Sequence, residues 1–174
     1  MSVRSFGAAF TVLVLAAGTV AAQPAKLNDA QIAHIAYTAG EIDIKAAQQA
    51  LQKCRNPEVR QFAQDMVRDH TAVNKQALAL VQKLQVTPQD NPTSQAIVKQ
   101  ASDKRRELSR LRGAAFCRAY AQNEVAYHQT VNNALETTLI PSASNSELKS
   151  LLETGLKIFQ GHQQHAEHVA AELK

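Results

Sequence analysis

Histidine and carboxylate residues recur inside the apolar stretches of this sequence, and side chains of these types can bind a transition metal. The segment FAQDMVRDHTAVN (residues 62–74) is echoed by YAQNEVAYHQTVN (residues 120–132), so that a histidine falls within an apolar run in both. Histidine nitrogen and carboxylate oxygen are the ligands with which helical bundles hold metals in their cores. The candidate ligands are Asp43, His70, Glu124, His128, His162 and His165.

Helical periodicity places these candidates on or beside the apolar faces of four predicted helices. Four of them point inward near the midpoints of their helices: Asp43, His70, Glu124 and His162. His128 and His165 lie at the borders of their apolar faces. The midpoints of bundled helices are level whichever way each helix runs. The sequence therefore predicts one polar layer halfway along an otherwise apolar core.

Two interpretations of this layer are open. The first is a metal centre that holds iron, copper, manganese or zinc. The second is a structural layer, in which buried imidazoles and carboxylates hydrogen-bond to one another and fix the helix register. A di-iron centre of the usual kind needs four carboxylates and two Glu-x-x-His pairs. This chain instead spaces Glu124 and His128 by four residues and has Met66 where the second helix would need an acid.

The elements that must position this layer are four long helices. They are predicted over residues 28–53, 57–84, 114–139 and 145–173. Asn28 with Gln31 and Ser144 with Glu147 form capping boxes at two of the helix starts. A shorter polar helix over residues 94–112 follows a proline-rich loop, and no segment has the pattern of a strand. The fold class is therefore all-α, a four-helix bundle.

The first 22 residues predict a secretory signal peptide. Arg4 is followed by an apolar run over residues 6–17 and by small residues that suit cleavage after Ala22. That run is too short for a transmembrane helix. Residues 23–174 then form one helical domain, which we expect in the periplasm without a membrane span.

Two cysteines in an exported chain predict one disulfide, between Cys54 and Cys117. Cys54 ends the first long helix and Cys117 lies in the first turn of the third. A simple up-down-up-down bundle would hold them at opposite ends, far beyond the Cα separation of about 7 Å that a disulfide allows. The disulfide therefore requires the connection over residues 87–112 to cross the length of the bundle, which is the topology of ferritin-like bundles.

The charge balance gives little reason to expect nucleic acid as a partner. The chain has 19 basic and 15 acidic residues, and Arg4 of the predicted signal peptide is one of the basic ones. The basic stretch DKRRELSRLR (residues 103–112) contains Asp103 and Glu107 at helical pairing distances, which predicts a solvated crossover helix. The alternative is an interaction module that uses Arg105 and Arg106.

Three motifs together resemble an exported bacterial family, the domain of unknown function 4142. They are MVRDHTAVN, FCRAYAQNEVAYH and FQGHQQHAEH, and the resemblance extends over residues 27–173. It implies a ferritin-like four-helix bundle in an exported protein, and such proteins are often described as outer-membrane proteins. Of these locations, peripheral association with the envelope is the one that suits this sequence. Cys117 departs from the family, whose members usually have aspartate there.

Two functions follow as expectations. The first is an exported helical protein with a binding or envelope stress-protection role, which is not a demonstrated enzyme. The alternative is a metal-binding protein or metal-dependent oxidoreductase that uses the histidines and carboxylates of the mid-bundle layer.

Overall fold

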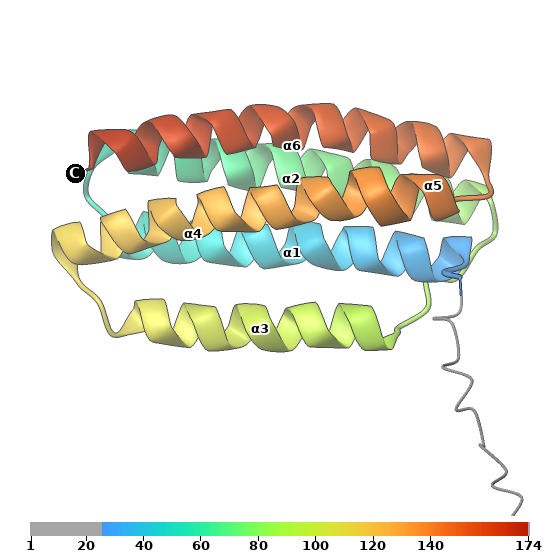
Figure 1. Cartoon of the computed structure of the whole chain (residues 1–174), viewed down its shortest axis with the longest axis horizontal. Helices are drawn as coiled ribbons and strands as arrows, with labels where there is room; N and C mark the ends of the chain where they lie inside the picture. The colour runs from blue at the N-terminus through green and yellow to red at the C-terminus, as the bar shows by residue number, and fades with distance from the viewer. Residues whose placement is uncertain (1–25, 174) are drawn as a thin grey trace, which may run out of the picture.

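Helices account for nearly all of the regular structure in the computed structural model, which describes residues 26–173 (Figure 1). The four long helices are α1 (Asp29–Lys53), α2 (Pro57–Lys83), α4 (Gly113–Ala134) and α6 (Ser146–Glu172). Within residues 26–173 there is no strand, so the all-α prediction is confirmed. The predicted signal peptide lies outside the described residues.

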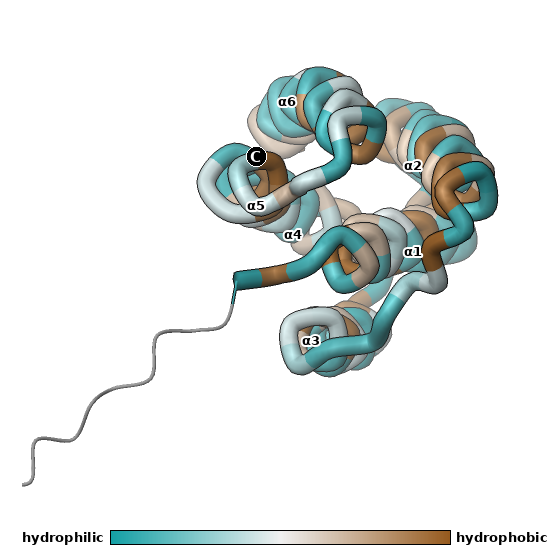
Figure 2. The backbone as a smooth tube through the Cα atoms, turned by 90° about the vertical axis from the view of Figure 1, so that its right-hand side faces the viewer, coloured by the Kyte–Doolittle hydropathy of each residue, from teal (hydrophilic) through white to brown (hydrophobic). Residues whose placement is uncertain are grey.

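A fifth helix, α3 (Pro92–Ser109), is the predicted crossover. It packs against α1 and α4, outside the ring that the four long helices form when the bundle is viewed end-on (Figure 2). Because α3 runs the length of the bundle, α4 begins at the end where α1 finishes, and α2 and α4 run in the same direction (Figure 1). Membership among ferritin-like bundles in particular stays a prediction.

The predicted disulfide is present, and it joins the end of α1 to the start of α4, as the crossover topology requires. Cys54 follows the last residue of α1 and Cys117 lies in the first turns of α4. Their Cα atoms are 5.4 Å apart and their sulfurs are bonded. No helix among the described residues is both long and apolar enough to cross a membrane.

Local sequence signals set most of the helix starts. Asn28 and Gln31 form the predicted capping box at α1. The Asn56 side chain accepts from the first turn of α2, where Pro57 occupies the first helical position. Asn91 does the same for α3 in a further capping box. These caps satisfy backbone N–H groups that a helix start otherwise leaves without partners.

The predicted start of α6 is wrong by one residue. The expected capping box of Ser144 with Glu147 does not form; instead the Asn145 side chain accepts from the backbone N–H groups of Glu147 and Leu148. The reason is a contact from another helix. The Asp29 carboxylate at the start of α1 accepts from the N–H groups of Ser144 (2.8 Å) and Asn145 (2.9 Å), which holds both residues outside the helix.

The end of the third long helix also differs from the prediction. The α-helix stops at Ala134 and continues as a π-helical turn, η1 (Leu135–Leu139), and a short helix, α5 (Ile140–Ser142). A π-helical turn is wider than an α-helical one and is often found at functional sites. The chain therefore runs beyond the predicted end with a change of geometry.

The apolar core has two clusters, one at each end of the bundle. The disulfide-end core consists of Ala46, Ala47, Ala50, Cys54, Val59, Phe62, Ala63, Met66, Leu108, Phe116, Cys117, Tyr120, Ala121, Ala166 and Val169. The cavity-end core consists of Ile32, Ala33, Ile35, Val81, Leu135, Leu139, Leu148, Leu152 and Phe159. On every long helix the inward polar residues fall between the two clusters in sequence. The fold thus places a polar layer at the junction of two apolar cores.

Candidate metal centre

The structure brings five of the six candidate ligands together in this layer. Their exposed fractions are 0% for Asp43, 3% for His70, 0% for Glu124, 1% for His128 and 7% for His162. They come from all four long helices. His128, which the sequence places at the border of its face, is as deeply buried as the others. Five ionisable groups removed from water must become neutral, or be paired with one another or with a cation.

Three imidazole rings surround the Asp43 carboxylate. The ring centroids of His70, His128 and His162 are 5.2–5.8 Å apart. One nitrogen from each ring lies within 4.8 Å of the others, and a second group with the same spacing joins Asp43, Glu124 and His128. This spacing allows one ion to contact several of the side chains at once.

Asp43 Oδ2 is the point on which two of these rings converge. It lies 3.2 Å from His70 Nε2 and 3.3 Å from His128 Nε2. Neither contact has the angles of a hydrogen bond, so both carboxylate oxygens and both Nε2 atoms are buried without a hydrogen-bond partner. Buried polar atoms in native proteins are almost always partnered, and a cluster of exceptions needs a physical explanation.

The tautomer of His128 makes this convergence unfavourable without a cation. His128 Nδ1 lies 3.0 Å from the backbone carbonyl of Glu124, which can only accept, so the hydrogen is on Nδ1. Burial lowers the pKa of His128, which keeps the ring neutral and leaves a lone pair on Nε2. That lone pair faces Asp43 Oδ2, itself an acceptor. Two acceptors at 3.3 Å repel each other unless a positive charge lies near both.

His162 has the opposite tautomer for a similar reason. Its Nε2 donates to Asp69 Oδ2 at 3.1 Å, so Nδ1 carries a lone pair, and that atom is buried and unpartnered. Burial, together with the charge of His70, lowers the pKa of His162 to about 4. Histidines that bind metals usually donate their second N–H to a carboxylate or a backbone carbonyl. His128 and His162 each have one of these two partners.

Asp69 is the functional residue that the sequence analysis missed. The Arg68 guanidinium holds the pKa of Asp69 below its usual range, with bonds of 2.7 Å and 3.0 Å to its two oxygens. Asp69 therefore stays ionised and accepts from His162. It lies at the edge of the apolar stripe of α2, and its position next to His70 is the only signal that pointed to it.

The two carboxyl groups of the layer differ in charge. Burial tends to raise the pKa of Asp43, but its interaction with the neighbouring imidazoles, that of His70 above all, outweighs burial, so the pKa is lowered and Asp43 is ionised. Burial and the neighbouring Asp43 raise the pKa of Glu124 well above its ordinary value. Glu124 is therefore neutral, and its Oε2 has no hydrogen-bond partner. The layer offers one anionic and several neutral ligands.

His70 is held by stacking rather than by hydrogen bonds. Its ring lies parallel to that of Phe159, with centroids 4.5 Å apart and planes 8° apart. Both of its ring nitrogens are buried and have no hydrogen-bond partner. The ring is thus fixed in orientation, and neither tautomer costs it a hydrogen bond, so one nitrogen can offer its lone pair to a ligand.

His165 does not join the layer. It is half-buried, and its ring packs edge-on against Phe62 of the disulfide-end core, with centroids 5.1 Å apart. His168 is exposed. Of the three histidines in residues 162–168, only His162 reaches the centre.

Comparisons with known proteins agree with this fold. CopM in its Cu(II)-bound form has a similar structure, with a TM-score of 0.64 over 86% of this chain and 100% of that chain. The two sequences are 15% identical, so the likeness concerns the fold alone. A comparison with curated proteins finds no match. The family model described as a domain of unknown function, DUF4142, matches residues 15–169, and the chain therefore belongs to this family.

Proposed function

We propose that this protein is an exported metal-binding protein whose bundle holds one divalent transition-metal ion at mid-height. The ligands are Asp43, His70, His128 and His162, with Glu124 beside them. The observation that carries this proposal is the convergence of buried, unpartnered acceptors. His128 Nε2 and Asp43 Oδ2 face each other at 3.3 Å, while His162 Nδ1 and both nitrogens of His70 lack hydrogen-bond partners.

A purely structural layer explains less of this geometry. A proton shared between His70 and Asp43 would satisfy one contact. It would leave lone pairs on His128 Nε2 and His162 Nδ1 buried without a donor. Each such group costs about 1–3 kcal/mol relative to a partnered one. A cation among the three rings would bind one lone pair from each of them, including those on His128 and His162, so the metal-binding function is favoured.

The ligand types favour copper. Three imidazoles and a carboxylate suit Cu, Zn, Fe or Ni, and Cu(II) binds most tightly to nitrogen and oxygen ligands in the usual order of divalent metals. Thiolate is excluded because both cysteines are in the disulfide. The likeness of fold to a protein that has been solved in a Cu(II)-bound form adds support for copper. Zinc, iron and manganese are the competitors to be tested.

The proposed role is sequestration of the metal in the cell envelope. A disulfide is typical of proteins in an oxidising compartment, which agrees with a signal peptide over residues 1–22 and a periplasmic mature chain. The ligands are at least nine-tenths buried, which suits tight holding of an ion. Envelope protection against excess metal would follow from this binding, without turnover of a substrate.

The test is elemental analysis of protein that has been exported through its own leader and purified without chelators or a histidine tag. We expect about one transition metal per chain, with Cu(II) the ion most tightly rebound by the stripped protein. His128→Leu should lose this metal and His168→Leu should keep it, because only His128 lies in the layer. N-terminal sequencing of the same sample should begin at Gln23. A stripped protein that ignores copper, zinc, iron and manganese would show that the layer is structural.

A further inference from the structure

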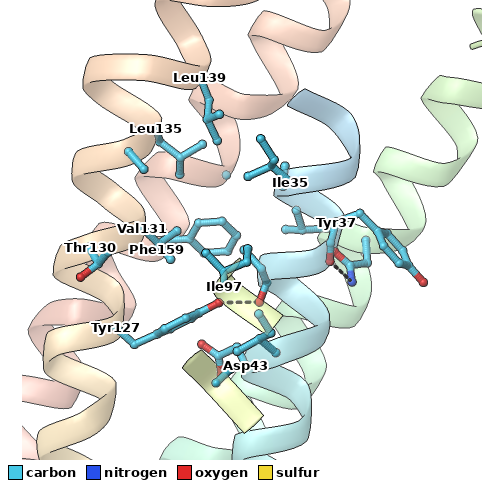
Figure 3. Close-up of a pocket in the computed structure, with 18 of the residues that line it drawn as sticks. Ile35, Tyr37, Asp43, Ile97, Tyr127, Thr130, Val131, Leu135, Leu139 and Phe159 are labelled. Atoms are coloured by element: carbon cyan, nitrogen blue, oxygen red, sulfur yellow. Dashed lines mark hydrogen bonds between the residues drawn. The ribbon is translucent and has the colours of Figure 1, made fainter. Parts of the chain in front are cut away.

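A cavity of about 360 Å³ adjoins the polar layer and extends through the cavity-end core. All four long helices line it, together with α3 (Figure 3). Ile35, Val131, Leu135 and Leu139 form its aliphatic wall, and Asp43 lies at its inner end. Pockets of 300–1,000 Å³ with mostly apolar walls are the usual size for small organic ligands.

Small residues and the π-helical turn create this space. Ala36, Ala77, Ala134 and Gly155 line it from the four long helices, at positions where a filled core would have larger side chains. η1 widens the end of the third long helix and turns Leu135 and Leu139 toward the cavity. The sequence thus keeps a space open in one half of the core while the other half is filled.

The cavity is elongated along the bundle. Phe159, at the level of the polar layer, and Leu148, near the bundle end, both line it from α6. These two residues are separated by about 16 Å at a rise of about 1.5 Å per residue. The walls between them are aliphatic, which suits a linear hydrocarbon chain better than a broad ring system.

The side of the cavity next to α3 is lined by residues of that helix, and two of these, Lys104 and Arg105, are basic. Ile97 of α3 lines the cavity near the Tyr127 hydroxyl, which donates to the Ala39 carbonyl at 2.7 Å (Figure 3). Arg105 lines both this cavity and the neighbouring groove between α1 and α3. It is half-buried.

Arg105 differs from its neighbours in having no anionic partner. Lys104 pairs with Glu107 at 2.7 Å, and Arg106 pairs with Asp103 at 3.0 Å. Among residues 26–173, no carboxylate forms an ion pair with the Arg105 guanidinium. A half-buried guanidinium that lines an apolar cavity is a suitable site for a carboxylate.

We propose that this cavity binds one molecule of a medium-chain fatty acid of about twelve carbons, with its carboxylate at Arg105 and its hydrocarbon chain inside the cavity-end core. The orientation follows from charge. Asp43 and Arg105 both line the cavity on the side of the polar layer, where the Arg105 carbonyl accepts from Gln49 of α1. The Asp43 carboxylate would repel an anion there and Arg105 attracts one, so the carboxylate of the ligand lies at Arg105. The aliphatic walls then receive the chain as far as Leu139 and Leu148. This site adjoins the proposed metal ligands, since Asp43 lines its inner end, but binding of the fatty acid does not require the metal.

The experiment measures binding of laurate and of dodecanol, a neutral molecule of the same chain length, to delipidated mature protein by calorimetry. Laurate should bind with one site per chain and more tightly than dodecanol. Arg105→Gln should weaken laurate about tenfold, the usual effect of losing a hydrogen bond to a charged group, and should leave dodecanol unchanged. Arg110→Gln is the matched control, because Arg110 is exposed on the same segment and does not line the cavity.

A second pair of variants tests the part of the cavity that would hold the hydrocarbon chain of the fatty acid. Ala77→Leu should fill the cavity and abolish binding of both molecules, whereas Ala79→Leu should not, because Ala79 is exposed on the same helix. Absence of laurate binding to the wild-type protein would overturn the proposal, as would equal laurate affinity in wild type and Arg105→Gln. Laurate should still bind to His128→Leu, so loss of the metal and loss of the fatty acid are separate results.

Discussion

The two ends of the core are built by the same four helices but are filled differently. In the disulfide-end core three aromatic rings are completely buried: Phe62, Phe116 and Tyr120. They pack as neighbours, with centroids of Phe116 and Tyr120 6.3 Å apart and those of Phe62 and Tyr120 6.2 Å apart. The cavity-end core has mostly aliphatic side chains and one aromatic ring, that of Phe159, around a cavity of about 360 Å³. One end is closed by rings and a disulfide, and the other is left open.

This difference bears on the metal binding that is proposed for the polar layer. A group of buried ligands needs fixed orientations, which a well-packed core on one side provides. It also needs room for its ligand to arrive, which a solid core on both sides would deny. The layer lies between a filled end and an open end, and so meets both requirements.

Removing the disulfide should have the largest effect. The double variant Cys54→Ala, Cys117→Ala frees a connection of 63 residues, and we expect the free energy of unfolding to fall. The chain-entropy model gives a loss of about 4 kcal/mol. Urea unfolding of the two proteins measures it. Hydrogen exchange should accelerate first at the disulfide end; earlier exchange at the cavity end would contradict the assignment of rigidity to the disulfide end.

Truncating one side chain at each end should reveal unequal packing. Phe62→Ala should lower the free energy of unfolding by about 3–4 kcal/mol, because it opens a void in a filled core and removes the ring that contacts His165. Leu135→Ala should cost about 2 kcal/mol, since its side chain already borders a cavity and loses fewer contacts. Thermal and urea unfolding give both values. Equal costs would mean that the two ends are packed alike.

The layer itself should make the metal-free protein less stable as the pH falls. The pKa of His162 is lowered from 6.5 to about 4 in the folded state. Above pH 6.5 the ring is neutral in both states. Between pH 6.5 and about 4 the unfolded chain binds a proton that the folded protein does not, so the free energy of unfolding decreases, by about 3 kcal/mol over the full interval.

The variant His162→Gln isolates this effect. The difference between the unfolding free energies of wild type and His162→Gln should shrink by that amount as the pH is lowered from 6.5 to 4. His168→Gln is the control and should show no such change, because His168 is exposed. A difference that does not vary with pH would show that His162 titrates normally in the folded protein.

Much of this arrangement could be predicted from the sequence. Asp43, His70, Glu124 and His162 recur at helical spacing within apolar stripes, and periodicity alone identifies such positions. The positions of Cys54 and Cys117 required the crossover, because a disulfide has a short reach. The first of these inferences needs only the face of its own helix on which a side chain lies, and the second needs only the order of the helices and the short reach of a disulfide.

What could not be predicted depends on which helices are neighbours. The pairing of Asp69 with His162 exists because α2 and α6 pack together, and the pattern of either helix alone does not contain it. His165 shows the same limit, since the ring of Phe62 decides its direction. The cavity was missed because alanine and glycine in an apolar stripe are typical of close helix packing as well as of empty space.

The pairing of Asp69 with His162 should set the metal affinity. Asp69→Asn keeps the shape but removes the charge that fixes the tautomer of His162. We expect metal affinity to fall about 10–100-fold, which is usual when a residue that orients a ligand is lost. Asp65→Asn is the matched control, because Asp65 also pairs with Arg68, at 2.6 Å, without contacting His162. Titration of the stripped proteins with Cu(II) against a competing chelator measures both; equal losses would mean a general charge effect.

The smallest changes in the free energy of unfolding are expected from two Gly→Ala substitutions, because the two glycines differ in how closely their neighbours approach. A Cβ on Gly40 would lie 2.4 Å from Asn74 Oδ1, whereas one on Gly155, in the cavity wall, would lie 3.4 Å from the Phe159 ring. Gly40→Ala should therefore displace Asn74 from its bond to the Tyr37 carbonyl and lower the free energy of unfolding by about 1 kcal/mol.

Gly155→Ala should instead raise the free energy of unfolding by about 1 kcal/mol, because alanine stabilises a helix relative to glycine and the cavity accepts the methyl group. Gly161→Ala gives the propensity effect alone, since nothing lies within 4 Å of its Cβ position. If Gly155→Ala stabilises the protein as much as Gly161→Ala does, the methyl group meets no resistance in the cavity. If Gly155→Ala destabilises the protein, the cavity wall is tightly packed at Gly155, as the contact of Gly40 with Asn74 is. The two ends of the core would then differ only in the disulfide.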